Sequence, residues 1–310
     1  SAASDVYKRQ ELEVEQAKKT RAAAEEKRDL AYAAFEAEKT EKQKLEPVGM
    51  GTAFPFLKEK NHVVSIIGGG GKTTLLYEMA GFCVKNDQKV LVTTSTHIYR
   101  PPKEWHDQSL EAVERKFRTG RAAIIGSACR DPEKLSMPET ELFEAARKKA
   151  DLTLIEADGA RHLPCKAPAE HEPALLSSSD LVIGVTGLSA LGQPLGKGCF
   201  RAERAAELLD CTMEHHITEE DLARLIASEQ GQQKDLKGRT FYAVLHQYEE
   251  KEHRAAAEKL VELLRRQGIE HVLVTCATGN RRQSGENTNP WYGRAELPVR
   301  EAEEEWEPGE

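Results

Sequence analysis

The sequence lacks several features that would each place it in a familiar class of protein. None of its six cysteines forms a C-x-x-C pair, so the spacing favours neither a structural zinc site nor a disulfide framework. No apolar run is long enough to span a bilayer, and no signal-peptide core opens the chain. Scattered thiols are typical of reducing compartments, so we expect a cytoplasmic protein.

Positive charge is also in short supply. The 310 residues contain 44 Lys and Arg against 52 Asp and Glu, a formal net charge of -8. Nucleic acids and anionic membranes bind concentrated positive surface, so this balance argues against both as partners. The length suffices for one large α/β domain or two smaller ones, and there is no internal repeat.

The first part of the chain differs in composition from the rest. Residues 11–46 have neither proline nor glycine and are rich in Glu, Lys, Arg and Ala, which favours a solvated helix, with a partner-binding coiled coil as the alternative. The opening SAASDVYKRQ has no initiator methionine and resembles a translated scar at the end of an assembled fragment, so we expect it to be non-native. We assign residues 1–50 to a charged helical arm, 52–278 to an α/β domain and 279–310 to a polar, acidic, disordered tail.

Within the central region, short apolar runs alternate with helical patterns. Continuous apolar strands are typical of parallel sheets covered on both faces, and the alternation predicts a three-layer, doubly wound, mostly parallel α/β domain. The predicted strands are Val63–Ile67, Val90–Thr94, Ala122–Ile125, Leu152–Glu156, Leu181–Val185, Tyr242–Leu245 and Val272–Thr275. The predicted helices are Lys72–Lys85, Leu110–Arg118, Glu139–Lys149, Arg201–Leu209, Glu219–Ala227 and Glu250–Gln267.

Four consecutive glycines separate the first of these strands from the first helix. In such a turn the backbone N–H groups and the helix N-terminus can cradle phosphate oxygens, while a Cβ would block the close approach. Lys72 is expected to reach the β and γ phosphates, and the Thr73 hydroxyl to bind Mg²⁺. A glycine-rich turn without a ligand is the alternative. The predicted nucleotide-binding residues are Gly68, Gly69, Gly70, Gly71, Lys72, Thr73 and Thr74.

This loop departs from the common G-x-x-x-x-G-K-[ST] pattern, because position 66 is Ile. It resembles the K-G-G-x-G-K-[ST] loop of the SIMIBI class of P-loop NTPases, although Ile67 replaces the first lysine of that pattern. The resemblance implies phosphate binding without the lysine-mediated dimer switch of that class.

Two further segments end at the carboxyl ends of predicted strands, where open α/β sheets bind ligands. Glu156 and Asp158 are candidates for holding magnesium and for catalysis, and Glu156 with Gly159 makes an E-x-x-G similar to the D-x-x-G of GTPase switches. Thr94 could ligate Mg²⁺ or orient water, and His97 could shuttle a proton. For each segment, ordinary turn or strand residues are the alternative.

The sequence contains no clear base-recognition motif. GTPases read guanine with N-K-x-D after a late strand, whereas the corresponding position here reads HQYE, residues 246–249. Guanine specificity is therefore not favoured, and both ATP and GTP remain open.

Four collinear blocks resemble the YqeC family, named for an accessory role toward selenium-dependent hydroxylases. The blocks are IIGGGGKTTLL, VLVTTSTHIY, LIEADGARHLPCKAPAEHEP, and LVIGVTGLSALGQPL followed by RAE. They fall within residues 52–278, and Phe200 stands where a histidine usually precedes Arg201. The resemblance implies a P-loop nucleotide-binding protein that assists maturation of a selenium- and molybdenum-containing hydroxylase.

The third block also predicts a second binding surface. Cations that follow directly on a magnesium-side strand could bind a second anion, or could simply face water. Cys165, within the same loop, is either a thiol activated by these cations or a plain buried thiol. The predicted second-anion residues are Arg161, Lys166, His171, Glu172 and Arg201.

Together these observations predict a Mg²⁺-dependent, ATP- or GTP-binding protein, a slow NTPase that matures a selenium-dependent molybdenum hydroxylase. Its expected partners are the nucleotide and either the apo-hydroxylase or a selenium or molybdopterin intermediate. A small-molecule kinase or nucleotidyl transferase and a non-catalytic, nucleotide-switched binding module are the alternatives. The candidate catalytic residues are Lys72, Glu156, Asp158 and His97.

Overall fold

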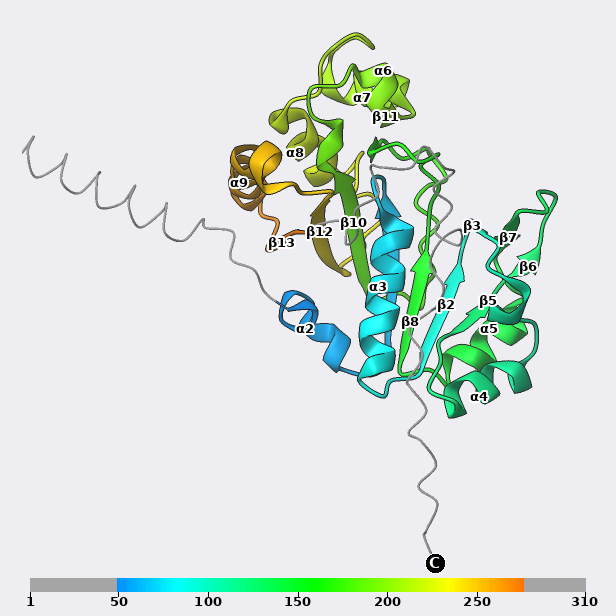
Figure 1. Cartoon of the computed structure of the whole chain (residues 1–310). Coiled ribbons are helices and arrows are strands. Elements are labelled where there is room, and N and C mark those ends of the chain that lie inside the picture. Colours follow the sequence, from blue (N-terminus) through cyan, green and yellow to red (C-terminus); the bar gives the residue numbers. More distant parts are fainter. Residues whose placement is uncertain (1–48, 276–310) are drawn as a thin grey trace, which may run out of the picture. The chain divides into compact units, whose positions relative to one another are not determined.

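The structure, a computed structural model, describes residues 49–275 (Figure 1). The predicted non-native opening, most of the charged arm and the acidic tail lie outside these residues. Met50, at the expected end of the arm, begins the short helix α2 and packs against the core. The helices are α2 Met50–Ala53, α3 Lys72–Lys85, α4 Leu110–Arg118, α5 Thr140–Arg147, α6 Leu195–Gly198, α7 Ala202–Leu209, α8 Glu219–Ala227 and α9 Glu250–Arg266.

Eight strands form one parallel sheet in the order β13-β12-β10-β1-β8-β2-β5-β4. After β1, the chain forms β2, β4 and β5 on one side of the sheet. It then returns to place β8 between β1 and β2. The strands β10, β12 and β13 follow on the other side of β1. This is the doubly wound, parallel α/β architecture that the sequence predicts. The strands are β1 His62–Gly68, β2 Val90–Thr94, β4 His106–Asp107, β5 Ala123–Ile125, β8 Leu152–Glu156, β10 Leu181–Gly187, β12 Thr240–His246 and β13 His271–Val274.

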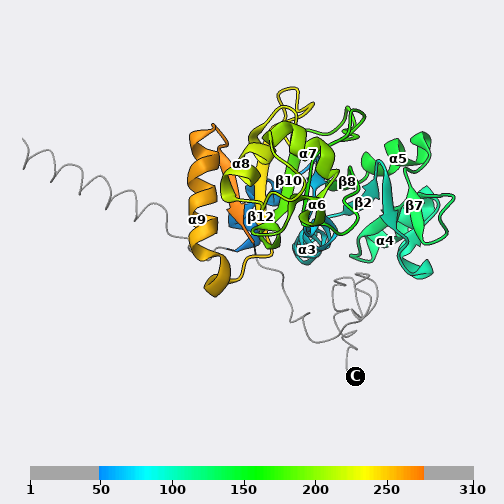
Figure 2. The same ribbon diagram turned by 90° about the horizontal axis from the view of Figure 1, so that it is seen from above.

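Helices cover both faces of the sheet because successive strand residues point to opposite sides. Val64 and Ile66 of β1 belong to the core cluster that packs under α3, whereas Val63 belongs to the cluster under α4 and α5. Figure 2 shows α9 at one end of the sheet and α4 with α5 near the other. Burial on both faces explains why the central strands are apolar at nearly every position.

The structure confirms all seven predicted strands and all six predicted helices, with boundaries that shift by at most two residues. Among the described residues, the sequence did not predict β4, at the edge of the main sheet, or five further strands of two or three residues that lie outside this sheet. Two of them form a parallel pair, and three form an antiparallel sheet in the order β3-β7-β6. These strands are β3 His97–Tyr99, β6 Ser127–Ala128, β7 Lys134–Ser136, β9 Cys165–Lys166 and β11 Cys199–Phe200.

Among residues 49–275, no helix combines the length and the apolar character needed to cross a bilayer.

Candidate nucleotide-binding site

Three predicted site segments meet at the carboxyl edge of the sheet. Glu156, the last residue of β8, pairs in register with Ile66 of β1 on one side and with Thr94 of β2 on the other. The glycine turn follows directly on β1 and leads into α3. The site is therefore assembled by strand register, from segments far apart in the sequence.

The backbone of the glycine turn leaves no room for side chains. Gly70 and Gly71 have φ values of +80° and +129°, which L residues rarely adopt. A Cβ at Gly70 would overlap the backbone of Gly187, and one at Gly71 would overlap the ring of His246. Glycine is thus required by close packing against the ends of β10 and β12. Ile66 lies inside β1, fully buried, which explains why no glycine is needed there.

The N–H groups of the turn divide into two sets. Those of Gly68, Gly69 and Gly70 donate to Asp158 Oδ2, Val185 O and Leu163 O, at 3.0, 2.8 and 3.0 Å. By contrast, the N–H groups of residues 71–74 have no acceptor within the described part of the chain. These four donors lie at the start of the 14-residue helix α3, where the helix dipole favours an anion.

The Lys72 ammonium lies beside the same turn and is 6% exposed. It donates to Gly68 O at 2.6 Å and forms an ion pair with Asp158 Oδ1 at 3.1 Å. Asp158 Oδ2 also accepts from Gly68 N–H, so this carboxylate fixes both the loop and its lysine. Asp158 does not line the cavity beside the turn. Its geometry is therefore that of a positioning group.

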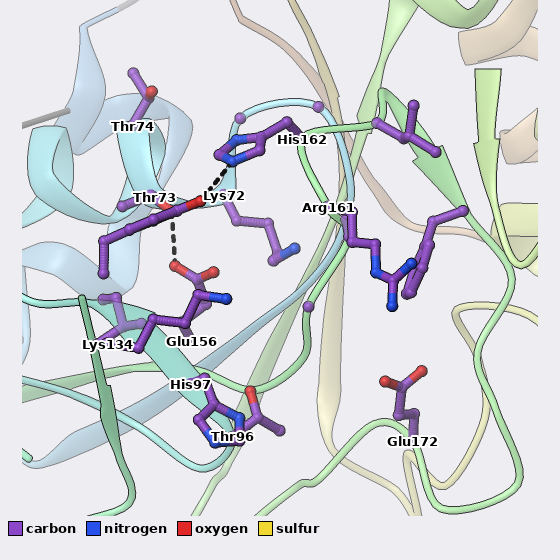
Figure 3. A pocket seen from close by; sticks show the side chains of 18 of the residues that line it. Lys72, Thr73, Thr74, Thr96, His97, Lys134, Glu156, Arg161, His162 and Glu172 are labelled. Atoms are coloured by element: carbon purple, nitrogen blue, oxygen red, sulfur yellow. Dashed lines mark hydrogen bonds between the residues drawn. The ribbon is translucent and has the colours of Figure 1, made fainter. Parts of the chain in front are cut away.

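Thr73 and Glu156 form the second polar pair of the site. The Thr73 hydroxyl donates to Glu156 Oε2 at 2.8 Å, as the dashed line in Figure 3 shows, and both residues line the cavity. Burial raises the pKa of Glu156, although Lys72 and the Thr73 hydroxyl oppose this effect. A divalent cation would offset the buried charge and favour the ionised form.

These residues fit a magnesium ion that is shared with a phosphate ligand. Within residues 49–275, no group of three or more His, Cys, Asp or Glu side chains converges to form a self-contained metal site. Mg²⁺ commonly takes one or two protein oxygens and completes its shell with phosphate and water oxygens. Thr73, in the first turn of α3, and Glu156, at the end of β8, supply such oxygens.

A chain of buried charges extends from the site into the following loop. The Lys166 ammonium is 2.9 Å from Glu172 Oε2 and 3.0 Å from Asp158 Oδ2, and its side chain is 1% exposed. Arg201 then contacts Glu172 through two hydrogen bonds of 3.0 and 3.2 Å. Burial alone would raise the pKa of Glu172, but Arg201 and Lys166 outweigh it and hold this pKa at about 2.

This arrangement separates the predicted second-anion residues into two groups. Lys166 lies buried between Asp158 and Glu172, so its charge is not available to a ligand in solution. Arg161, His171, Glu172 and Arg201 line the cavity, whereas Lys166 does not. The sequence alone does not separate these residues, because all five are polar. Four of them lie close together in the chain, and Arg201 lies at the start of a predicted helix.

Hydroxyls after β2 have roles different from the expected ones. Thr94 is fully buried, donates to Glu156 O and accepts from Thr96 N–H, and it does not line the cavity. The Thr96 hydroxyl is buried without a hydrogen-bond partner and lies on the cavity wall together with His97. The T-T-S-T-H pattern indicated hydroxyls at this edge, but only the fold shows which of them faces the cavity.

Cys165 is the buried thiol of the two alternatives. The Cys165 thiol donates a hydrogen bond to Cys199, and this bond together with burial raises the pKa of Cys165 well above the usual range, which keeps the thiol protonated. Among the described residues, Cys165 and Cys199 face each other in the β9–β11 pair as free thiols. Cys165 is therefore unsuited to act as a thiolate nucleophile.

The segment at the N-K-x-D position also reaches the cavity. His246, Gln247, Tyr248 and Glu249 all line it. Burial lowers the pKa of His246 to about 4, so the imidazole is neutral near pH 7, and it contacts Thr275 Oγ1 at 2.7 Å. Sequence reasoning treated this segment only as a degraded motif. Its packing against Gly71 required knowledge of the sheet order.

The parallel sheet, the helices on its two faces and the glycine turn between β1 and α3 are consistent with a P-loop NTPase-like fold. Comparison with known proteins makes the assignment more specific. The profile of the YqeC family, described as YqeC protein, matches residues 64–203. The chain is also 28% identical, over 226 residues, to the uncharacterized protein YqeC of Escherichia coli (strain K12), an alignment that covers 68% of this chain and 85% of that relative. The chain is therefore similar to the YqeC family over residues 64–203.

Proposed function

We propose that this protein binds a nucleoside triphosphate in a Mg²⁺-dependent manner and hydrolyses it slowly. The observation that carries this proposal is the set of four unbonded N–H groups at residues 71–74, beside the Lys72 ammonium and the Thr73–Glu156 pair. Helix N-terminal donors and a lysine suit phosphate oxygens, and a threonine with a carboxylate suits magnesium.

Each residue then has a role that follows from its present contacts. The N–H groups of residues 71–74 would bind phosphate oxygens, and Lys72 would exchange its contact with Gly68 O for them. Asp158 keeps Lys166 and Gly68 N–H as partners throughout, so no buried charge is left alone. Thr73 and Glu156 would hold Mg²⁺, and the bound ion would neutralise part of the phosphate charge. Catalysis would consist mainly of positioning and charge stabilisation.

We further propose that nucleotide binding serves the maturation of a selenium-dependent molybdenum hydroxylase in the cytoplasm. The hydroxylase role is what the resemblance of the four sequence blocks implies, and the free thiols among the described cysteines support a reducing compartment. The client in this proposal is the apo-hydroxylase or a selenium or molybdopterin intermediate.

The test measures Mg²⁺-dependent binding and hydrolysis of ATP and of GTP by calorimetry and phosphate release. Lys72→Ala should weaken nucleotide binding at least ~10-fold, which corresponds to about 1.4 kcal/mol. Thr73→Ala should remove most of the magnesium dependence and leaves Asp158 untouched. Lys85→Ala, at the exposed end of the same helix, is the matched control and should bind like the wild type. Absence of binding of both nucleotides at millimolar concentration would contradict the proposal.

A further inference from the structure

The cavity beside the glycine turn is larger than one ligand requires. Its volume is about 1410 Å³, whereas pockets for single small molecules usually measure about 300–1,000 Å³. The first turn of α3 and Glu156 occupy one side of it. Another part of its wall is formed by the small sheet β3-β7-β6 and by the loop after β8, which also contacts the glycine turn through Leu163 O.

Arg161 presents an uncompensated positive charge on this part of the cavity wall. Its side chain is exposed to the cavity, and no carboxylate within the described residues forms an ion pair with it. The guanidinium instead lies over the Phe200 ring, with Cζ 5.3 Å from the ring centroid. Arg201 lies over the same ring at 4.8 Å, but its charge is matched by Glu172. An arginine held on an aromatic ring keeps its hydrogen-bond donors free for an anion.

The backbone holds this arginine in an unfavourable conformation. Arg161 and His162 both have left-handed φ values, +48° and +63°, which cost non-glycine residues about 1–2 kcal/mol each. His162 is fixed across the cavity wall by Tyr99 of β3, whose hydroxyl lies 2.8 Å from Nε2 and whose ring stacks at 5.5 Å. The strained turn thereby keeps Arg161 directed toward the open space between Lys72 and Glu172 (Figure 3).

Thr96 provides a second polar group without a partner on the same wall. Its hydroxyl is buried and forms no hydrogen bond, which is costly unless a ligand or water satisfies it. Figure 3 shows Thr96 beside His97 and below Glu156. The proposed phosphate roles of Lys72, Thr73 and Glu156 use none of these groups.

We propose that this side of the cavity binds a second small molecule through an oxyanion group, a phosphate or a carboxylate. Arg161 is its principal anchor, and the Thr96 hydroxyl is a second contact. The inference rests on the proposed function in that the second molecule shares the cavity with the nucleotide. It does not depend on nucleotide hydrolysis.

The test titrates inorganic phosphate, and in parallel acetate, into protein saturated with Mg²⁺ and a non-hydrolysable nucleotide. One anion site should remain in the loaded protein, and Arg161→Leu should weaken it at least ~10-fold while nucleotide affinity stays within about twofold. Thr96→Val should weaken it less, by a few-fold. Arg121→Leu, an exposed arginine outside the cavity, is the matched control and should leave anion binding unchanged.

Binding of either probe in an Arg161-dependent manner supports the inference and identifies the anionic group. Binding of neither probe, or binding that Arg161→Leu leaves unchanged, overturns it. If nucleotide itself fails to bind, phosphate is titrated into the Lys72→Ala protein, whose α3 site is weakened. A remaining Arg161-dependent site would then uphold the second site while the nucleotide proposal fails.

Discussion

Asp158 illustrates how much one side chain can determine at the residue scale. Its two oxygens contact Lys72, Lys166 and the Gly68 N–H, all at 3.0–3.1 Å and all away from solvent. The carboxylate therefore carries the balancing charge for two buried ammonium groups. In the sequence, Asp158 is an equally good candidate for magnesium, because a carboxylate that follows a buried strand fits that role.

Replacing Asp158 with Asn should lower the free energy of unfolding by about 3 kcal/mol, because it leaves two buried cations without a carboxylate between them. Nucleotide affinity should fall as well, since the Gly68 turn loses its charged acceptor. Chemical denaturation followed by circular dichroism measures the first effect. Asp235→Asn, at a half-exposed carboxylate, is the control and should stay within about 0.5 kcal/mol of the wild type. An Asp158→Asn protein as stable as this control would show that the buried charges are compensated elsewhere.

The elements of the fold differ in how much of their stability is encoded locally. Helix α8 begins with a capping box in which the Thr218 side chain accepts from Asp221 N–H and the Asp221 side chain accepts from Thr218 N–H. The sequence analysis located this helix at Glu219–Ala227, and the structure gives the same bounds. Local hydrogen bonds and apolar periodicity act over a few residues, so a sequence reveals them directly.

Thr218→Ala should lower the free energy of unfolding by about 1 kcal/mol, because it removes the acceptor for the N–H group at the start of α8. Thermal denaturation of the variant should show a correspondingly lower midpoint. Thr212→Ala, at an exposed threonine in the preceding turn, serves as the control. Equal midpoints for the two variants would show that the cap contributes nothing to stability.

Other elements could not be predicted, for a physical reason. Strands β3, β6 and β7 contain two or three residues each, too few for any periodicity to be detected. Their pairing depends on contacts between distant segments, as does the ion pair between Lys166 and Asp158. The glycine turn, Lys72, Thr73 and Glu156 were identified because each lies at a strand or helix end. The Thr96 hydroxyl and the His246 ring were not, because their importance depends on sheet order.

At the scale of the whole molecule, acid should destabilise the fold through a buried imidazole. Burial lowers the pKa of His246 to about 4 from an ordinary value of 6.5. The unfolded chain therefore takes up a proton at this site before the folded protein does. The resulting loss of stability begins as the pH falls below about 6.5 and is complete near pH 4.

This effect can be isolated by comparing the wild type with His246→Gln, which carries no charge at any pH. Between pH 7 and 8, the difference in unfolding free energy between the two proteins should be constant. By pH 5, the wild type should have lost about 2 kcal/mol of stability relative to His246→Gln. Denaturation curves at a series of pH values measure it. His216→Gln, at an exposed histidine, should show no such pH-dependent difference. If the difference in unfolding free energy between the wild type and His246→Gln did not change with pH, the folded protein would be accepting the proton on His246 without loss of stability.

The position of β1 in the sheet has a consequence for how the chain folds during synthesis. β1 pairs with β8, which begins at Leu152, and with β10, which begins at Leu181, so neither neighbour exists when β1 leaves the ribosome. Contacts that close such long loops form late and slow folding. Until β10 has been made, an apolar strand and the glycine turn stay without their final neighbours, which exposes the nascent chain to aggregation. The order of the strands therefore delays formation of the phosphate site until β10, which ends at Gly187, has been synthesised.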